Sequence, residues 1–138
     1  ESGRIRDLRH RVDIHPIAAR ECSQAAEQLA RIAERINARE GNGTMLDNTL
    51  IVYLSDGAES HHSRCWEWPM VLLGNINGRL RTGRYLDYPG YGHTGHRTTA
   101  NMYLTLLQLA GANRESFGLA DPALRDLDQR GPLQELLD

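Results

Sequence analysis

Residues 16–40 carry apolar side chains at the spacing of an amphipathic helix. The apolar positions recur every three or four residues, at Ala18, Cys22, Ala25, Ala26, Leu29, Ile32, Ala33 and Ile36. This 3.6-residue period predicts one helix. Pro16 suits its first position, where a backbone N–H would have no partner in any case. Gly41, Asn42 and Gly43 predict its end, because glycine tolerates the left-handed conformation of a helix cap.

Two shorter apolar runs predict strands. Residues 49–54, Thr-Leu-Ile-Val-Tyr-Leu, have the composition of a central strand covered on both faces. Residues 69–73, Pro-Met-Val-Leu-Leu, form a second run that Gly74 closes. The pair Asn77-Gly78 predicts a turn, and residues 79–86 are then expected to form a short hairpin arm.

The C-terminal third predicts a second helix over residues 98–110, with Gly111 as its end. Asp121 and Pro122 predict a further helical turn, and residues 133–137 either a docking tail or a frayed end. Helix, strand, strand, helix is the order of an α/β fold. Two strands alone are marginally stable, so we expect further strands from residues absent here or from a partner chain.

Composition describes one globular domain of 138 residues, 40% hydrophobic and 25% charged. A net charge of -2 argues against a nucleic-acid binder, whose domains are usually basic. All 16 basic residues are arginine, which excludes chemistry that needs a lysine Schiff base or a phosphate-loop lysine. No apolar run approaches the roughly 20 residues of a membrane span.

The chain begins at Glu1 without a signal-peptide pattern, so we expect it to be cut or processed from a longer protein. Cys22 and Cys65 are too few for a disulfide framework or a four-thiolate zinc site. We expect no disulfide between them, because Cys22 lies on the apolar stripe of the first helix and is typical of a small core residue.

Asp56 follows the most apolar strand directly, and His61 and His62 come shortly after it. Ligands of open α/β sheets bind beyond the carboxyl ends of the strands. A carboxylate with imidazoles suits zinc, manganese or iron, and adjacent histidines point in different directions, so one of the two would face such a site. The alternative is a solvated loop whose histidines are structural.

A second cluster, His93, His96 and Arg97, precedes the second helix. Free backbone amides at a helix N-terminus favour anions, so these residues could hold a phosphate, a sulfate or a metal. The alternative is a helix capped by Thr98 or Thr99, with histidines that lie on the surface.

Trp66 and Trp68 lie beside the first cluster in sequence, where they could stack on a sugar or form an apolar rim; burial against the first helix is favoured. Nothing in the sequence lowers the pKa of Cys65 or orients a base toward it, which disfavours a nucleophilic role. Ser55 and Ser63 lack the Gly-x-Ser-x-Gly elbow of serine hydrolases.

Residues 46–57, Leu-Asp-Asn-Thr-Leu-Ile-Val-Tyr-Leu-Ser-Asp-Gly, resemble the alkaline phosphatase and sulfatase superfamily. In that superfamily the segment runs Asp-Asn-Thr-Leu-Ile, an apolar strand, then Ser-Asp-His-Gly. Residues 101–111 resemble its late helix. The ordered set 55–57, 61–62, 69–74 and 82–89 is similar to one uncharacterised branch of large exported bacterial proteins. The resemblance covers about residues 16–120.

This resemblance implies that Asp56 is a metal ligand. Gly57 stands where the superfamily has its next ligand, a histidine, so one ligand is missing or is supplied differently. His61 or His62 is the best candidate for a later ligand, with His93 or His96 as alternatives. The superfamily nucleophile, a Ser, Thr or formylglycine on an earlier strand, has no counterpart here, so the chain carries half of a site.

The resemblance therefore implies that residues 1–120 are the C-terminal part of an alkaline-phosphatase-like α/β domain and that residues 121–138 are a tail. The expected function is metal-assisted hydrolysis of a phosphate or sulfate ester by an exported, periplasmic or extracellular parent, with the fragment alone inactive. Its expected partners are a divalent metal (zinc, manganese or calcium), the N-terminal part of the parent and an anionic ester, but no nucleic acid. The rival is a non-catalytic exported protein that keeps the fold for binding or assembly.

Overall fold

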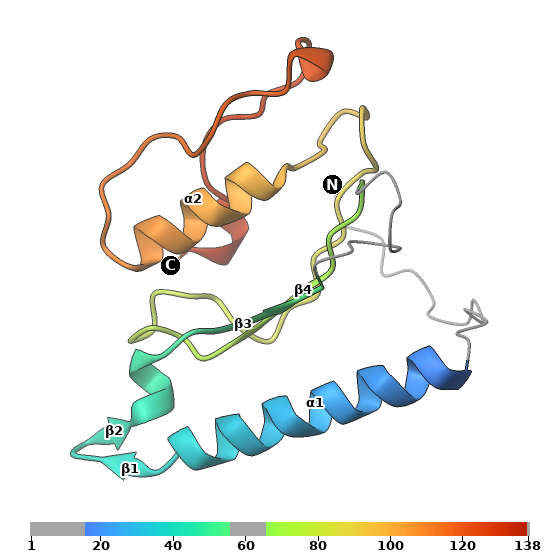
Figure 1. Ribbon diagram of the computed structural model, residues 1–138. Coiled ribbons are helices and arrows are strands. Elements are labelled where there is room, and N and C mark those ends of the chain that lie inside the picture. The colour runs from blue at the N-terminus through green and yellow to red at the C-terminus, as the bar shows by residue number, and fades with distance from the viewer. Residues whose placement is uncertain (1–15, 56–65, 138) are drawn as a thin grey trace. The chain divides into compact units, whose positions relative to one another are not determined.

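The computed structural model describes residues 16–55 and 66–137 (Figure 1). The described residues form a small mixed α/β structure with two α-helices and two small antiparallel sheets. In chain order the elements are α1 (Pro16–Ile36), β1 (Arg39–Glu40), β2 (Gly43–Thr44), η1 (Met45–Asn48), β3 (Ile51–Leu54), β4 (Met70–Leu73), α2 (Thr99–Leu109), η2 (Pro122–Leu124) and η3 (Gln134–Leu136), where η marks a short 3₁₀ helix.

The chain divides into two compact units, residues 1–35 and 36–138. Helix α1 makes up the described part of the first unit and begins at Pro16, as its sequence predicts. It ends at Ile36 rather than at residue 40. Gly41 and Asn42 do not cap it; they are the turn of the β1–β2 hairpin, in which Glu40 pairs with Gly43. Gly41 has φ +61°, which the two-residue turn of a hairpin requires.

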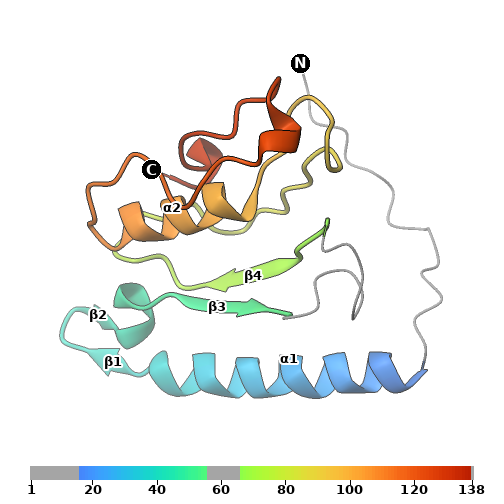
Figure 2. The same ribbon diagram turned by 45° about the horizontal axis from the view of Figure 1, so that its top comes forward.

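Strands β3 and β4 confirm the two predicted strands and pair antiparallel, with Ile51 opposite Leu73 and Tyr53 opposite Val71. Strand β4 runs back alongside β3, and the end of β3 at Leu54 lies opposite the start of β4 at Met70 (Figure 2). One face of the pair packs against the core of the second unit, through Leu72. Tyr53 and Val71 lie on the other face, where the second unit by itself leaves them exposed, so coverage of both faces stays a prediction.

The core of the second unit forms between α2 and the C-terminal segment, which runs back alongside this helix in both views (Figures 1 and 2). Four buried leucines make up the central cluster: Leu80, Leu109, Leu133 and Leu136. Leu80 pairs with Leu137 in an isolated antiparallel bridge, and the Arg81 N–H donates to the Leu136 carbonyl at 3.0 Å. The predicted hairpin arm over 79–86 is therefore wrong, because the pairing partner of Leu80 is the tail. The tail docks and does not fray.

Two buried polar side chains of α2 fix the tail in place. The Asn101 amide oxygen accepts from the backbone N–H and the hydroxyl of Thr98, at 2.8 and 2.9 Å. Its NH₂ group donates to three consecutive tail carbonyls, those of Gln129, Arg130 and Gly131, at 2.7–3.3 Å. The Thr105 hydroxyl donates to the Asn101 carbonyl and accepts from the Leu133 N–H, both at 2.7 Å. Among the described residues no buried side-chain polar atom lacks a partner.

A tight turn follows β4 and confirms the turn predicted at Asn77-Gly78. Ile76 and Asn77 both have positive φ, and the Asn77 N–H donates to the Asp47 carbonyl at 2.6 Å. Gly74, with φ +100°, opens the turn directly against the backbone of Thr49. A side chain there would overlap with the Thr49 carbonyl oxygen, so only glycine allows this approach.

Gly74→Ala and Gly78→Ala form a matched pair, because both glycines have positive φ but only Gly74 lies against other atoms. Gly78→Ala is expected to lower the free energy of unfolding by about 1–2 kcal/mol, the cost of a left-handed alanine. Gly74→Ala adds a steric overlap and should cost about 1–3 kcal/mol more. Urea denaturation of both variants measures the difference. Equal losses would show that the contact with Thr49 does not constrain the turn.

Asn101→Asp is expected to lower the free energy of unfolding by about 3 kcal/mol or more, measured by denaturation at neutral pH. Aspartate keeps the acceptor for Thr98 but replaces the donor with a charge facing three carbonyl oxygens. The exposed Asn113→Asp is the control for the change of charge and should be nearly neutral. A loss as small as that of the control would mean that the tail is held by its leucines alone.

Candidate functional site

The strand-end site predicted from Asp56, His61 and His62 lies outside the described residues, as do Cys65 and with it the expected absence of a disulfide. The structure describes the residues just before this predicted site: β3 ends at Leu54, and Ser55 follows it. Because β4 runs antiparallel, the segment from 55 to 69 joins two neighbouring strand ends rather than crossing to a parallel strand. In residues 16–55 and 66–137 no group of three His, Cys, Asp or Glu side chains is arranged to hold a metal.

His93, His96 and Arg97 share one loop ahead of α2. His96 is tied to this loop, with its ring Nδ1 at 3.1 Å from the Pro89 carbonyl oxygen and its backbone N–H donating to the His93 carbonyl at 3.0 Å. The guanidinium of Arg97 donates to the carbonyl of His96 at 3.4 Å. His93 is exposed. The loop therefore brings the three side chains of the predicted anion site into one short stretch, and anion binding by them stays a prediction.

Thr98 caps α2, which confirms one of the two predicted caps. Its hydroxyl accepts from the Asn101 N–H at 3.4 Å, while the Asn101 side chain accepts from the Thr98 N–H at 2.8 Å. This reciprocal capping box satisfies two of the amides that would otherwise favour an anion. Any anion at this end of α2 would consequently depend on the loop side chains more than on the helix itself.

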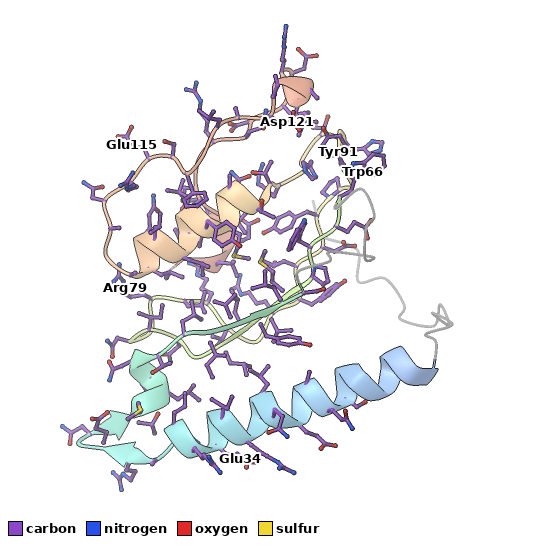
Figure 3. The ribbon with its side chains drawn as sticks, viewed as in Figure 1. Glu34, Trp66, Arg79, Tyr91, Glu115 and Asp121 are labelled. Carbon is purple, nitrogen blue, oxygen red and sulfur yellow. The ribbon has the colours of Figure 1, made fainter. Side chains whose placement is uncertain are left out.

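Three rings contact one another ahead of α2, and we call Trp66, Tyr91 and His96 the aromatic cluster. Figure 3 labels Trp66 and Tyr91. Trp66 stacks on Tyr91 with ring centroids 5.4 Å apart and planes at 8°. His96 meets the edge of Tyr91 with centroids 5.7 Å apart and planes at 75°. The side chain of Trp66 is 46% exposed, so the predicted burial of this tryptophan is wrong. Its neighbour Trp68 is half-buried.

The phenol of Tyr91 is anchored to the turn at η2. Its hydroxyl donates to Asp121 Oδ2 at 2.8 Å, and Asp121 Oδ1 caps η2 by accepting from the Ala123 N–H at 2.8 Å. The bond from Ala123, followed by that from Tyr91, lowers the pKa of Asp121. The hydrogen bond to Asp121 in turn raises the pKa of Tyr91. At neutral pH the pair is therefore a neutral phenol that donates to an ionised carboxylate.

A second tyrosine–carboxylate pair joins residue 88 to the tail. The Tyr88 hydroxyl donates to Glu135 Oε1 at 2.6 Å, and Arg84 Nη1 donates to the Glu135 carbonyl at 3.2 Å. Burial raises the pKa of Glu135, but the bond from Tyr88, a backbone hydrogen bond and the charge of Arg97 outweigh it, so that the pKa is lowered. Burial and the bond to Glu135 raise the pKa of Tyr88. The charge of Arg97 therefore acts on Glu135, whose hydrogen bond with Tyr88 helps to hold the tail.

The Asp-Asn-Thr segment that carries the family resemblance has a structural role. Asp47 Oδ2 accepts from the Thr44 N–H at 2.7 Å and from the Thr44 hydroxyl at 3.1 Å, which starts the short helix η1. Thr49 Oγ1 donates to the Met45 carbonyl at 2.8 Å and helps to end it. An open hollow of about 260 Å³ lies alongside, lined by Leu46, Asp47, Leu72, Leu73, Gly74, Asn75, Thr82 and Gly83. These contacts set the direction in which β3 begins.

Comparisons with protein-family models, with curated proteins and with solved structures found no match to this chain. Among the described residues, no helix is both long and apolar enough to cross a membrane.

The free energy of unfolding is expected to fall as pH drops through the acid range, below the ordinary pKa values of Glu and Asp. Glu135 and Asp121 have lowered pKa values in the folded protein, so the unfolded chain binds more protons there. Their stabilisation is complete above the unfolded pKa and is lost as pH falls through the folded one.

Denaturation at a series of pH values from about 7 to about 3 measures this slope. Glu135→Gln and Asp121→Asn should each make the slope shallower, whereas the exposed Glu115→Gln is the control. If the free energy of unfolding depends on pH equally in all three variants and in the unaltered chain, neither tyrosine–carboxylate pair is coupled to folding.

Proposed function

We propose that this chain is the C-terminal part of a phosphate- or sulfate-ester hydrolase with an alkaline-phosphatase-like fold. In this proposal Asp56, with His61 or His62, forms part of a divalent-metal site. The observation that carries it is the segment 46–57, whose Asp-Asn-Thr-Leu turn, apolar strand and Ser-Asp end follow the order of that superfamily.

The local structure supports this proposal in one respect. Strand β3 (Ile51–Leu54) occupies the position that the resemblance assigns to an apolar strand. The capping of η1 by Thr44 and Asp47, the contact of Gly74 with Thr49 and the pairing with β4 fix β3 from both sides. A ligand two residues beyond Leu54 would thus follow a rigid element, which a metal site needs.

The donor set is a carboxylate oxygen with one or two imidazole nitrogens. Such a mixture suits zinc or manganese better than calcium, which prefers ligands that are all oxygen. A bound metal of this kind polarises the ester oxygen and activates the nucleophile. His93, His96 and Arg97 would steady the anionic group through charge-assisted hydrogen bonds. The nucleophile itself would come from the part of the parent that precedes this chain.

One observation favours the rival function. Gly57 has no side chain to bind a metal where the superfamily has a histidine. If no other residue replaces it, the parent keeps the fold without hydrolysis and acts as an exported binding or assembly protein. Metal binding distinguishes the two proposals.

The 138-residue chain is expected to bind one zinc or manganese ion, measured by elemental analysis after dialysis and by calorimetric titration. Asp56→Asn should weaken the affinity by at least about tenfold, since loss of even an outer-shell partner has that effect. Asp87→Asn changes an exposed aspartate and is the matched control, which should bind the metal as tightly as the unaltered 138-residue chain does. Equal binding by both variants, or no binding by the unaltered chain, would overturn the proposed metal site.

Activity provides a second readout of the same proposal. The chain alone should not hydrolyse aryl phosphate or aryl sulfate esters with any added metal, because it lacks the nucleophile. The full parent should hydrolyse one of them and lose this activity with Asp56→Asn. Turnover by the chain alone, abolished by Asp56→Asn, would contradict the assignment of half a site.

A further inference from the structure

The turn that follows β4 contains three consecutive residues in the left-handed conformation. Ile76, Asn77 and Gly78 have φ of +47°, +57° and +79°. Glycine adopts this conformation freely and asparagine tolerates it, but isoleucine, which branches at Cβ, is rarely found there. The side chain of Ile76 packs against the leucine core, which holds the residue in this strained conformation. The turn is therefore a place where a chemical change would relax the chain.

Asn77 and Gly78 also form the dipeptide in which asparagine is chemically least stable. Because glycine has no Cβ, its nitrogen can approach the side chain of the asparagine before it. The Gly78 nitrogen loses its proton to solvent and bonds to Cγ of Asn77, while the side-chain nitrogen takes up a proton and leaves as ammonia. Water then opens the resulting succinimide ring at either carbonyl, which gives aspartate or isoaspartate. Water is consumed and ammonia is released, with no oxidation or reduction.

The structure leaves room for this ring at Gly78. Asn77 and Gly78 are both exposed, and a Cβ built at Gly78 would meet nothing within 4 Å. The attacking nitrogen is held back by Asn75, because the Gly78 N–H donates to Asn75 Oδ1 at 3.2 Å, a long bond between exposed groups. Breaking this bond frees the nitrogen without disturbing the core. Asn75 therefore controls how often the Gly78 nitrogen is available to attack.

The chain has a second Asn-Gly pair, Asn42-Gly43, which provides an internal comparison. Asn42 is also exposed, but Gly43 pairs with Glu40 in the β1–β2 hairpin. A Cβ at Gly43 would lie 3.0 Å from Asp47 Oδ2, so a carboxylate crowds this glycine. The negative charge disfavours loss of the Gly43 proton, and the strand pairing restricts its nitrogen. The two pairs thus have the same residues but different freedom to react.

We propose that Asn77 is a self-modification site, which converts to aspartate and isoaspartate in the folded protein faster than Asn42 and at a rate set by Asn75. Isoaspartate adds a main-chain carbon between the N–H of residue 77, which donates to the Asp47 carbonyl at 2.6 Å, and the N–H of Gly78. The turn then cannot keep both of these bonds in their present geometry. Since Asp47 belongs to η1, the modification loosens the contact between this turn and the segment before β3. The reaction needs no metal and no substrate, so it occurs whether or not the chain belongs to a hydrolase.

The test incubates the 138-residue chain in heavy-oxygen water at neutral pH and follows each Asn-Gly pair by peptide mass spectrometry. Conversion adds heavy oxygen to the residue, and an isoaspartate-specific methyltransferase measures the isoaspartate share. In the folded chain Asn77 should convert faster than Asn42, whereas in urea the two should convert at similar rates. Asn75→Ala should accelerate conversion of Asn77 about fivefold, the factor that one hydrogen bond is worth. Asn75→Asp keeps an oxygen acceptor for the Gly78 N–H and should not accelerate it.

Three results would overturn the proposal. The first is no conversion of Asn77 in the folded chain over a period in which the urea-unfolded chain converts. The second is conversion of Asn42 at least as fast as that of Asn77 in the folded chain. The third is equal rates at Asn77 in Asn75→Ala and Asn75→Asp. Asn42 also monitors the fold within each variant, because global unfolding accelerates both pairs, whereas loss of the Asn75 bond accelerates Asn77 alone.

Discussion

The second unit depends on a single buried amide. Asn101 is the only side chain among the described residues that both caps α2 and holds the tail, through Thr98 on one side and the carbonyls of 129–131 on the other. A carboxamide fits because its oxygen accepts and its nitrogen donates two N–H bonds. Ionised aspartate has no donor, leucine has neither function, and serine has a single O–H to donate. Since buried polar groups without partners are costly, this one residue makes the start of the helix and the path of the tail interdependent.

The same amide is connected to the exposed surface by a continuous series of contacts. Gln129, whose carbonyl accepts from Asn101, holds Asp121 with its side chain; Asp121 holds Tyr91, and Tyr91 stacks on Trp66. The series thus joins a buried amide to an aromatic ring at the surface, and its outer members Asp121, Tyr91 and Trp66 are labelled in Figure 3. Tyr88 and Glu135 fix the other end of the tail in a similar way. Both tyrosines act as neutral donors to carboxylates, so the arrangement is strongest at neutral pH.

The elements that the sequence predicts best are those with a local signal. The helix from Pro16, the strands at 51–54 and 70–73, the turn at Asn77-Gly78 and the Thr98 cap all follow from spacing or from residue type within a few positions. The pairing of Leu80 with Leu137, the role of Asn101 and the stack of Trp66 on Tyr91 join residues 25 to 57 positions apart, and no periodicity reports such contacts. Tyr91 stands in the sequence Tyr-Pro-Gly-Tyr-Gly, a composition typical of a loop that says nothing of a partner for the ring. The candidate metal ligands Asp56, His61 and His62 lie outside the described residues, so their proposed role rests on the sequence alone.

The bridge between Leu80 and Leu137 has a consequence for how the protein is made. The central cluster needs Leu133 and Leu136, yet the residues they cover, from Leu80 to Leu109, are synthesised first. While a ribosome is still adding the tail, α2 has its apolar side uncovered and the Asn101 amide has no tail carbonyls to bind. The second unit can therefore close only after residue 137 has emerged, so a nascent chain halted before that point would expose a leucine-rich surface suited to capture by a chaperone.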